Sequence, residues 1–248
     1  MQTRLLFGGP ATTPVKSLII INVTVFISQL GFLFLFKSSL LENFFGLEPR
    51  EITANFALWR FFSYMFLHSA GNPFHLLFNM LPLYMFGNEL VRHWGQRRFL
   101  VYYFVTGAGA GVCSWLAAMQ SDSIVIGASG AIYGLLLAYG MTWPNRVVYL
   151  NFLFPVKVKW LVIIMGAVAF ISSLSGTVPG RPESGVAHIA HLGGMVVGYL
   201  FLKGRDWRNR YSKFNEQRGR EQLKQQFELY YGDVRRKVER DNKKDSIH

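Results

Sequence analysis

The chain has 248 residues, of which 51% are hydrophobic and 16% are charged, and its mean hydropathy is +0.22. An ordinary soluble domain of this length does not need long uncharged segments to bury its core, and this chain has six of them. The net charge of +12 raises nucleic-acid binding as a function, but no aromatic-interleaved RNA motif or zinc-ligand spacing accompanies it. We therefore expect no nucleic-acid partner.

The six uncharged segments lie between flanking charges at residues 17–36, 61–88, 99–121, 123–145, 160–180 and 184–202. Each has at least 19 residues, and roughly 20 helical residues cross the hydrocarbon core of a bilayer. The sequence predicts an all-α membrane protein with six transmembrane helices. Its three regions are a cytoplasmic N-terminal arm (residues 1–14), the six-helix transmembrane domain (15–202) and a basic cytoplasmic tail (203–248).

The distribution of basic residues indicates the orientation of these helices. Six basic residues lie in the connections that would face inward and four in those that would face outward, and the tail carries fourteen together with eight acidic residues. By the positive-inside rule, both termini are expected in the cytoplasm and the protein in the inner (cytoplasmic) membrane. The N-terminus lacks a short apolar stretch followed by a small-residue cleavage site, so the first helix itself is expected to direct insertion.

Three connecting segments have compositions of their own. Residues 37–73 mix aromatic and charged side chains, which favours an element lying in the membrane interface over the alternative, a folded extracellular loop. Residues 175–183 are rich in Gly and Pro and are a candidate movable cap. Residues 212–238 have apolar positions at helical spacing, which predicts an amphipathic helix that docks on the membrane or on a partner. The single Cys113 is expected to be a packing residue.

Polar residues recur at one depth of the predicted bundle. The second, fourth and sixth helices all run from outside to inside, and His75 and Asn79 lie in the first turns of the second. Ser129 and His191 come six and seven residues after the starts of the fourth and sixth segments. A helical rise of about 1.5 Å per residue places both roughly 9–10 Å below the outer boundary. Polar groups at that depth are costly unless they face one another or a water-filled cavity, so we expect a shared site.

Helical spacing also indicates which residues face one another. His75 and Asn79 are four residues apart and share a face, as do Ser129 and Tyr133. Small residues at four-residue spacing let helix backbones approach closely. We expect two glycine pairs to pack against each other and so bring Ser129 near His191; the pairs are Gly130 with Gly134, and Gly194 with Gly198.

A serine within hydrogen-bond reach of a histidine forms a nucleophile–base pair. His75, Asn79 and the Ser129 backbone N–H are candidate donors to an oxyanion, and Tyr133 is expected to pack on the imidazole. A metal site of His75, His188 and His191 is disfavoured because no carboxylate or thiolate lies at that depth. We expect neither a metal nor a cofactor. Two other functions need no reactive hydroxyl: a transporter lined by the same polar residues, and a non-enzymatic membrane protein that binds clients.

The chain resembles the bacterial rhomboid intramembrane serine proteases in an ordered set of motifs. They are Trp59-Arg60, His75-Leu-Leu-Phe-Asn79, Gly127-Ala-Ser129-Gly130 followed by Tyr133, and Ala190-His191-Leu-Gly-Gly194. Gly-x-Ser-Gly alone is a weak signal, whereas the ordered set is specific and covers roughly residues 15–202. None of these motifs lies in the tail, residues 203–248.

The resemblance implies an endopeptidase in which Ser129 is the nucleophile and His191 the general base. It further implies that His75, Asn79 and the Ser129 N–H hold the oxyanion, with Gly127, Tyr133 and Gly194 supporting the site. Partners would be the lipid bilayer and transmembrane protein substrates, cut near the outer membrane boundary at segments with helix-breaking residues. Ala187-His188 repeats the pattern Ala190-His191. His191 is preferred because Gly-Gly follows it, and His188 is the alternative.

Overall fold

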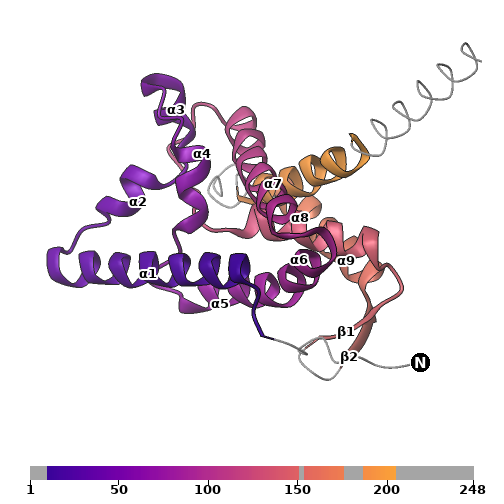
Figure 1. Ribbon diagram of the computed structural model, residues 1–248. Coiled ribbons are helices and arrows are strands. Elements are labelled where there is room, and N and C mark those ends of the chain that lie inside the picture. Colours follow the sequence, from indigo (N-terminus) through magenta and orange to yellow (C-terminus); the bar gives the residue numbers. More distant parts are fainter. Residues whose placement is uncertain (1–9, 151–153, 176–186, 205–248) are drawn as a thin grey trace, which may run out of the picture. The chain divides into compact units, whose positions relative to one another are not determined.

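The computed structural model describes residues 10–150, 154–175 and 187–204, which are mainly helical. The chain divides into two units, Met1–Phe201 and Leu202–His248, and only residues 202–204 of the second are described. Figure 1 shows the elements in chain order: α1 (Thr13–Phe36), α2 (Leu40–Phe45), α3 (Pro49–Asn55), α4 (Arg60–Ser63), η1 (Tyr64–Phe66), α5 (Pro73–Pro82), η2 (Leu83–Gly87), α6 (Asn88–Trp94), α7 (Gln96–Ala117), α8 (Ser129–Thr142), β1 (Val147–Leu150), β2 (Phe154–Lys157), α9 (Val158–Ser175) and a helix over residues 187–204. The predicted tail helix, residues 176–183 of the predicted cap and most of the N-terminal arm lie outside the described residues.

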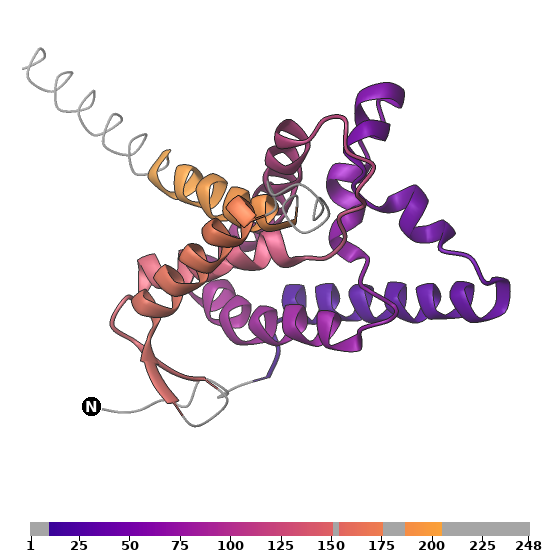
Figure 2. The same cartoon turned by 180° about the vertical axis from the view of Figure 1, so that it is seen from behind.

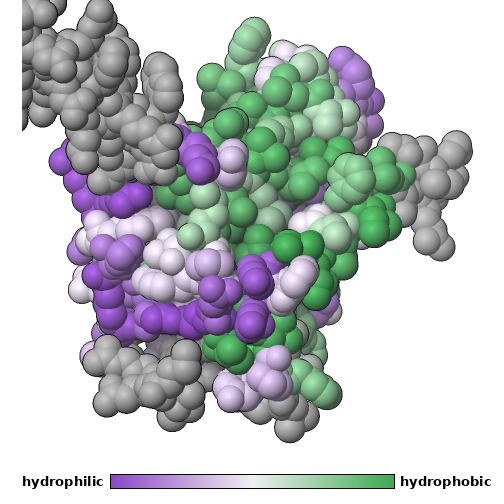
Figure 3. Space-filling view, turned by 90° about the vertical axis from the view of Figure 1, so that its right-hand side faces the viewer, coloured by the Kyte–Doolittle hydropathy of each residue, from purple (hydrophilic) through white to green (hydrophobic). Residues whose placement is uncertain are grey.

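Within the described residues, two helices, α1 and α7, are long and apolar enough to cross a membrane, and residues Val158–Leu174 form a shorter apolar helix. α1 begins with Pro14 in its first turn, where a missing N–H costs no helical hydrogen bond. Large apolar side chains are exposed on several elements, among them Phe34, Leu35, Phe56, Ile171 and Leu200. Figure 3 shows the resulting hydrophobic surface beside a region of hydrophilic side chains. Such a surface suits a bilayer rather than water, while the count of six spans stays a prediction.

The second predicted span is a helical run of three pieces, α5, η2 and α6. Asn72 caps its start, because the Asn72 side chain accepts a hydrogen bond of 3.2 Å from the backbone N–H of Phe74. Pro82 supplies no N–H, and the π-helical turn Leu83–Gly87 follows it directly. α5 runs beside α1 (Figures 1 and 2). His75 and Asn79 therefore lie in the first two turns of this run, as the sequence predicts.

The fourth predicted span is not one helix beginning near residue 123. Residues 118–128 form no helix, and Leu47 and Val125 pair in an antiparallel bridge with two backbone hydrogen bonds of 2.9 Å. α8 begins only at Ser129 and has 14 residues, a length of about 21 Å. A helical rise from residue 123 therefore does not apply to Ser129, because residues before it pair their backbone groups with another segment, and the depth of Ser129 stays a prediction. Ala131, Leu135, Ala138 and Tyr139 are fully buried, which makes α8 the central helix.

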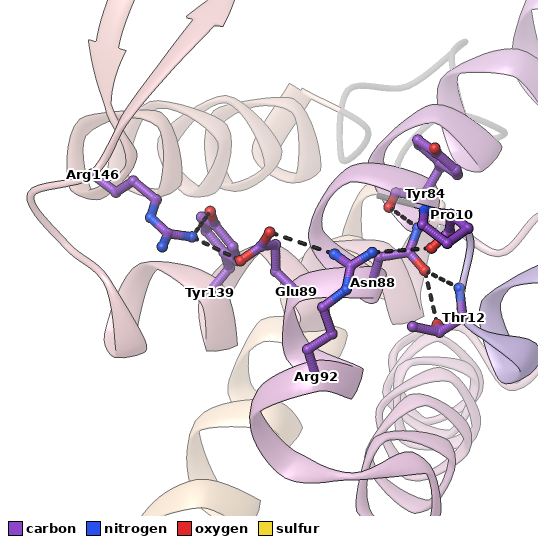
Figure 4. A network of polar contacts seen from close by, with 8 residues as sticks. All are labelled: Pro10, Thr12, Tyr84, Asn88, Glu89, Arg92, Tyr139 and Arg146. Atoms are coloured by element: carbon purple, nitrogen blue, oxygen red, sulfur yellow. Dashed lines mark hydrogen bonds and ion pairs between the residues drawn. The ribbon is translucent and has the colours of Figure 1, made fainter. Parts of the chain in front are cut away.

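Far from Ser129, polar contacts tie the end of α8 to α6, and α6 to the start of α1 (Figure 4). The Asn88 side-chain oxygen accepts hydrogen bonds from the backbone N–H and the hydroxyl of Thr12, at 2.7 and 2.8 Å. Arg146 pairs with Glu89 at 3.0 Å and donates to the Tyr139 hydroxyl at 2.8 Å. The antiparallel hairpin of β1 and β2 follows, with Val147 opposite Lys157. These contacts fix the helix ends on the side of the bundle opposite Ser129.

Arg60 ties together the first connection, residues 37–73. Its side chain is 4% exposed and donates to the carbonyl oxygens of Gly46 at 2.6 Å and Asn43 at 2.8 Å. Burial raises the pKa of the nearby Glu48 carboxyl, and the Arg60 guanidinium opposes that shift. Trp59 beside it is exposed and stacks on Phe44 with ring centroids 5.5 Å apart. One buried guanidinium thus closes a connection on which Phe44 and Trp59 face outward.

Arg60→Leu is expected to lower the free energy of unfolding by about 3 kcal/mol, because it leaves the buried Gly46 carbonyl oxygen and the part-buried Asn43 carbonyl oxygen without their charged donor. Arg50 is the matched control: its salt bridge to Asp122, 2.6 Å long, joins side chains that are 51% and 63% exposed. Arg50→Leu is expected to cost less than about 1 kcal/mol. Thermal unfolding in detergent micelles measures both, and equal losses would contradict the role assigned to Arg60.

Candidate active site

Ser129 stands at the junction between the extended segment and α8, and its side chain is half-buried. Two residues earlier, Gly127 has φ +118°, a conformation that side-chain-bearing residues rarely adopt, and its N–H donates to the Tyr64 carbonyl at 2.9 Å. A Cβ on Gly127 would lie 2.8 Å from Nε2 of His75. Glycine is required here both by the backbone and by the imidazole that occupies the side-chain space.

His191 meets Ser129 from the helix over residues 187–204. Its Nε2 lies 2.7 Å from the Ser129 Oγ. The Tyr133 ring, one turn after Ser129 on α8, stacks on the imidazole with centroids 4.4 Å apart and an interplanar angle of 1°. Nδ1 of His191 is buried and has no hydrogen-bond partner within the described ranges. The orientation of the imidazole is thus set by the serine at one ring nitrogen and by the tyrosine on one ring face.

The two helices that carry Ser129 and His191 touch at paired glycines. A Cβ on Gly194 would overlap the carbonyl oxygen of Gly130 and lie 2.8 Å from its carbonyl carbon. The other predicted contact, between Gly134 and Gly198, is wrong. Gly134 faces Thr106 and Gly198 faces the Tyr102 hydroxyl, both on α7. These two glycines pack on α7 because it lies between them.

His75 and Asn79 lie on the other side of Ser129, at the start of α5. The Asn79 Nδ2 donates to the His75 carbonyl at 2.7 Å, which uses one of its two hydrogens. The backbone N–H of Ser69 donates to Nδ1 of His75 at 3.3 Å. A neutral imidazole that accepts at Nδ1 carries its proton on Nε2, and this Nε2 is the atom beside Gly127. His75 therefore directs an N–H donor at the turn that precedes Ser129.

Comparison with known proteins decides the family. Residues 55–204, more than half of the chain, match the family model of the Rhomboid domain. The chain belongs to the rhomboid family. RHOMBOID-like protein 4 of Arabidopsis thaliana is 32% identical over 199 residues, covering 79% of this chain and 46% of that protein.

Two further relatives extend the comparison. Rhomboid-like protein 11, chloroplastic, of the same plant is 32% identical over 173 residues, which are 66% of this chain and 59% of that protein. Rhomboid protease AarA of Providencia stuartii is 28% identical over 218 residues, which are 80% of this chain and 74% of that protein. This rhomboid thus spans about half the length of the plant relatives and more of the bacterial one.

Three buried polar residues of this rhomboid support the site and were not predicted to do so. Tyr64 holds Gly127 through its carbonyl and donates from its hydroxyl to the Gly107 carbonyl at 2.7 Å. His68 is fully buried, and its ring meets the His75 ring edge-on with centroids 5.2 Å apart. Gln29 of α1 bonds to the backbone of His68. No motif in the sequence marks these three residues, because their roles depend on tertiary contacts.

The histidines in the part of the chain that the structure describes do not gather into a metal site. Within the described ranges, no group of three or more His, Cys, Asp or Glu side chains is placed to hold one metal ion. That finding counts against the alternative site of His75, His188 and His191. Cys113 packs against Gly193. The groups that the site brings together are the Ser129 hydroxyl, the imidazoles of His191 and His75, and the Asn79 amide.

Proposed function

We propose that this rhomboid-family protein is an intramembrane serine endopeptidase with a catalytic dyad of Ser129 and His191. The observation that carries the proposal is the 2.7 Å separation of Ser129 Oγ and His191 Nε2, in a chain of a membrane-embedded family that includes a protein named as a protease. Its substrates are transmembrane segments of other membrane proteins, cut near the outer boundary of the inner membrane. The chain has six membrane spans and both termini in the cytoplasm.

In the acylation step, the Ser129 oxygen attacks the carbonyl carbon of the scissile peptide bond as Nε2 of His191 takes the hydroxyl proton. His191 then returns this proton to the leaving amine. In deacylation, His191 activates a water molecule that hydrolyses the acyl-enzyme. The stacked Tyr133 ring keeps the imidazole aligned through both steps, which matters because Nδ1 of His191 has no acidic partner among the described residues.

Three donors surround the position of the developing oxyanion. The Ser129 N–H lies in the first turn of α8, where helical N–H groups have no intrahelical partner and the helix dipole favours negative charge. His75 supplies its Nε2–H beside Gly127, and Asn79 supplies the second hydrogen of its amide. Preorganised donors of this kind are each worth roughly 100- to 1,000-fold in rate.

A fluorophosphonate probe tests the proposal directly, because it reacts only with an activated serine. The purified wild-type protein is expected to be labelled and Ser129→Ala to remain unlabelled. The His188→Ala protein, which keeps the dyad, serves as the control for general loss of structure. Labelling of Ser129→Ala at the wild-type level, or no labelling of the wild type, would contradict the proposal. The second outcome would favour a transport or client-binding function instead.

A further inference from the structure

Gln29 lies in the middle of α1, is 1% exposed and bonds to both backbone groups of a residue in another segment. Its Oε1 accepts from the His68 N–H at 2.9 Å, and its Nε2 donates to the His68 carbonyl at 2.9 Å. The second Nε2 hydrogen goes to the Glu42 carboxylate of α2 at 2.5 Å. A reversed amide would place its oxygen against two acceptors, so these partners determine the orientation of Gln29.

The segment that Gln29 holds leads directly to His75. Ser69, the next residue after His68, donates its N–H to Nδ1 of His75. The His68 ring is fully buried and packs edge-on against the His75 ring at an interplanar angle of 60°. Residues 68 and 69 therefore determine both the position of the His75 ring and the nitrogen that carries its proton. Gln29 in turn determines where residues 68 and 69 lie.

We propose that Gln29 is a positioning residue of the reaction, which fixes the His68–Ser69 backbone so that His75 presents Nε2–H toward the oxyanion. This inference rests on the proposed function for the role of His75, but its structural part does not. Without the Gln29 amide, two buried backbone groups lose their partners, and a segment in that state moves to recover them. The Ser69 N–H then no longer holds Nδ1, and His75 gains a second tautomer and rotational freedom.

Asn22 provides a matched control on the same helix. It is fully buried, as Gln29 is, but its Nδ2 donates to the Leu18 carbonyl of α1 itself at 2.8 Å. Replacing either residue removes a buried amide from α1, and only Gln29 reaches the segment before α5. A comparison of Gln29→Met with Asn22→Met thus separates an effect on His75 from a general effect on helix packing. Gln29→Glu keeps an acceptor for the His68 N–H but sets a carboxylate oxygen against the His68 carbonyl and the Glu42 carboxylate, so it is expected to lose both signals below, as Gln29→Met does.

The first measurement is nitrogen-15 NMR of the full chain labelled at histidine, with the His75 signals assigned by His75→Ala. The wild type and Asn22→Met are expected to show one His75 tautomer with the proton on Nε2, and Gln29→Met a mixture of both tautomers. The second is cleavage of a model transmembrane substrate, for which Gln29→Met is expected to lower kcat about 10- to 100-fold with little change in KM.

A double-mutant cycle connects the two measurements. In a His75→Ala background, Gln29→Met is expected to cost less than about threefold more, because its effect passes through the missing imidazole. An unchanged His75 tautomer in Gln29→Met would overturn the inference. So would a loss of kcat on Gln29→Met that is as large in the His75→Ala background as in the wild type. If the wild type neither cleaves nor labels at Ser129, the proposed function fails, and the NMR comparison still decides whether Gln29 controls His75.

Discussion

Replacing His191 by alanine is expected to lower cleavage of a model transmembrane substrate by roughly 10,000-fold or more. Without the imidazole, the Ser129 hydroxyl loses the group at 2.7 Å that takes its proton, and an uncharged hydroxyl is a weak nucleophile. The measurement is kcat/KM in proteoliposomes with a fluorescent single-pass substrate. Adding Ser129→Ala to His191→Ala is expected to lower the rate no further, because the two residues act as a unit.

His188→Ala is the matched control, since the two histidines lie one turn apart on the same helix. The His188 ring meets the His191 ring edge-on with centroids 5.7 Å apart, while the bond to Ser129 is made by His191. We expect His188→Ala to change kcat/KM by about twofold. Loss of cleavage in His188→Ala with retention in His191→Ala would exchange the roles of the two residues and contradict the dyad proposed for this fold.

The parts of the site that could be predicted from the sequence are those set by periodicity within one helix. His75 and Asn79 are four residues apart on a helix that begins immediately before them, so their common face follows from helical geometry. Ser129 and Tyr133 have the same spacing, and the structure places Tyr133 against the imidazole that reaches Ser129. Helical repeat alone determines such relations, without knowledge of the neighbours.

The segment before Ser129 could not be predicted in this way. Residues 123–145 form one uncharged run, and composition does not distinguish its first six residues from a helix. Their extended course depends on the bridge between Leu47 and Val125, two residues far apart in the sequence. It depends also on Gly127, whose φ of +118° ends the extended segment immediately before α8. The pairing of Leu47 with Val125 thus overrides the helical preference of these apolar residues. As a result, Ser129 follows an extended segment and begins α8.

The supporting residues show the same limit. His68 has the sequence context of a loop, yet it is fully buried beside His75. Gln29 is one of five polar residues in the predicted span of residues 17–36, and only its contacts with residue 68 distinguish it from the others. Likewise, Gly134 and Gly198 were expected to meet each other, but each packs on α7 instead. Contacts of this kind depend on which third element lies between two helices. The spacing of residues along one helix does not predict that element.

Gly194→Ala is expected to lower cleavage about 100-fold and to reduce the free energy of unfolding by about 1–3 kcal/mol. The added methyl group would overlap the Gly130 carbonyl oxygen, which belongs to the backbone and cannot rotate away as a side chain does. The two helices must therefore separate. Because Gly130 follows Ser129 and Gly194 lies three residues after His191, this separation lengthens the hydrogen bond of the dyad. Cleavage in proteoliposomes and thermal unfolding in detergent measure the two effects.

Gly31→Ala is the control for adding a methyl group to a helical glycine of this protein. No atom lies within 4 Å of the position that its Cβ would take on α1, and alanine is favoured over glycine in a helix by roughly 0.5–1 kcal/mol. We expect Gly31→Ala to cleave at the wild-type rate and to be at least as stable. Wild-type cleavage by Gly194→Ala would show that the bond between Ser129 and His191 does not require the close approach of their helices. In that case, the alignment of the dyad would have to come from the Tyr133 stack alone, and Tyr133→Ala would then carry the full loss.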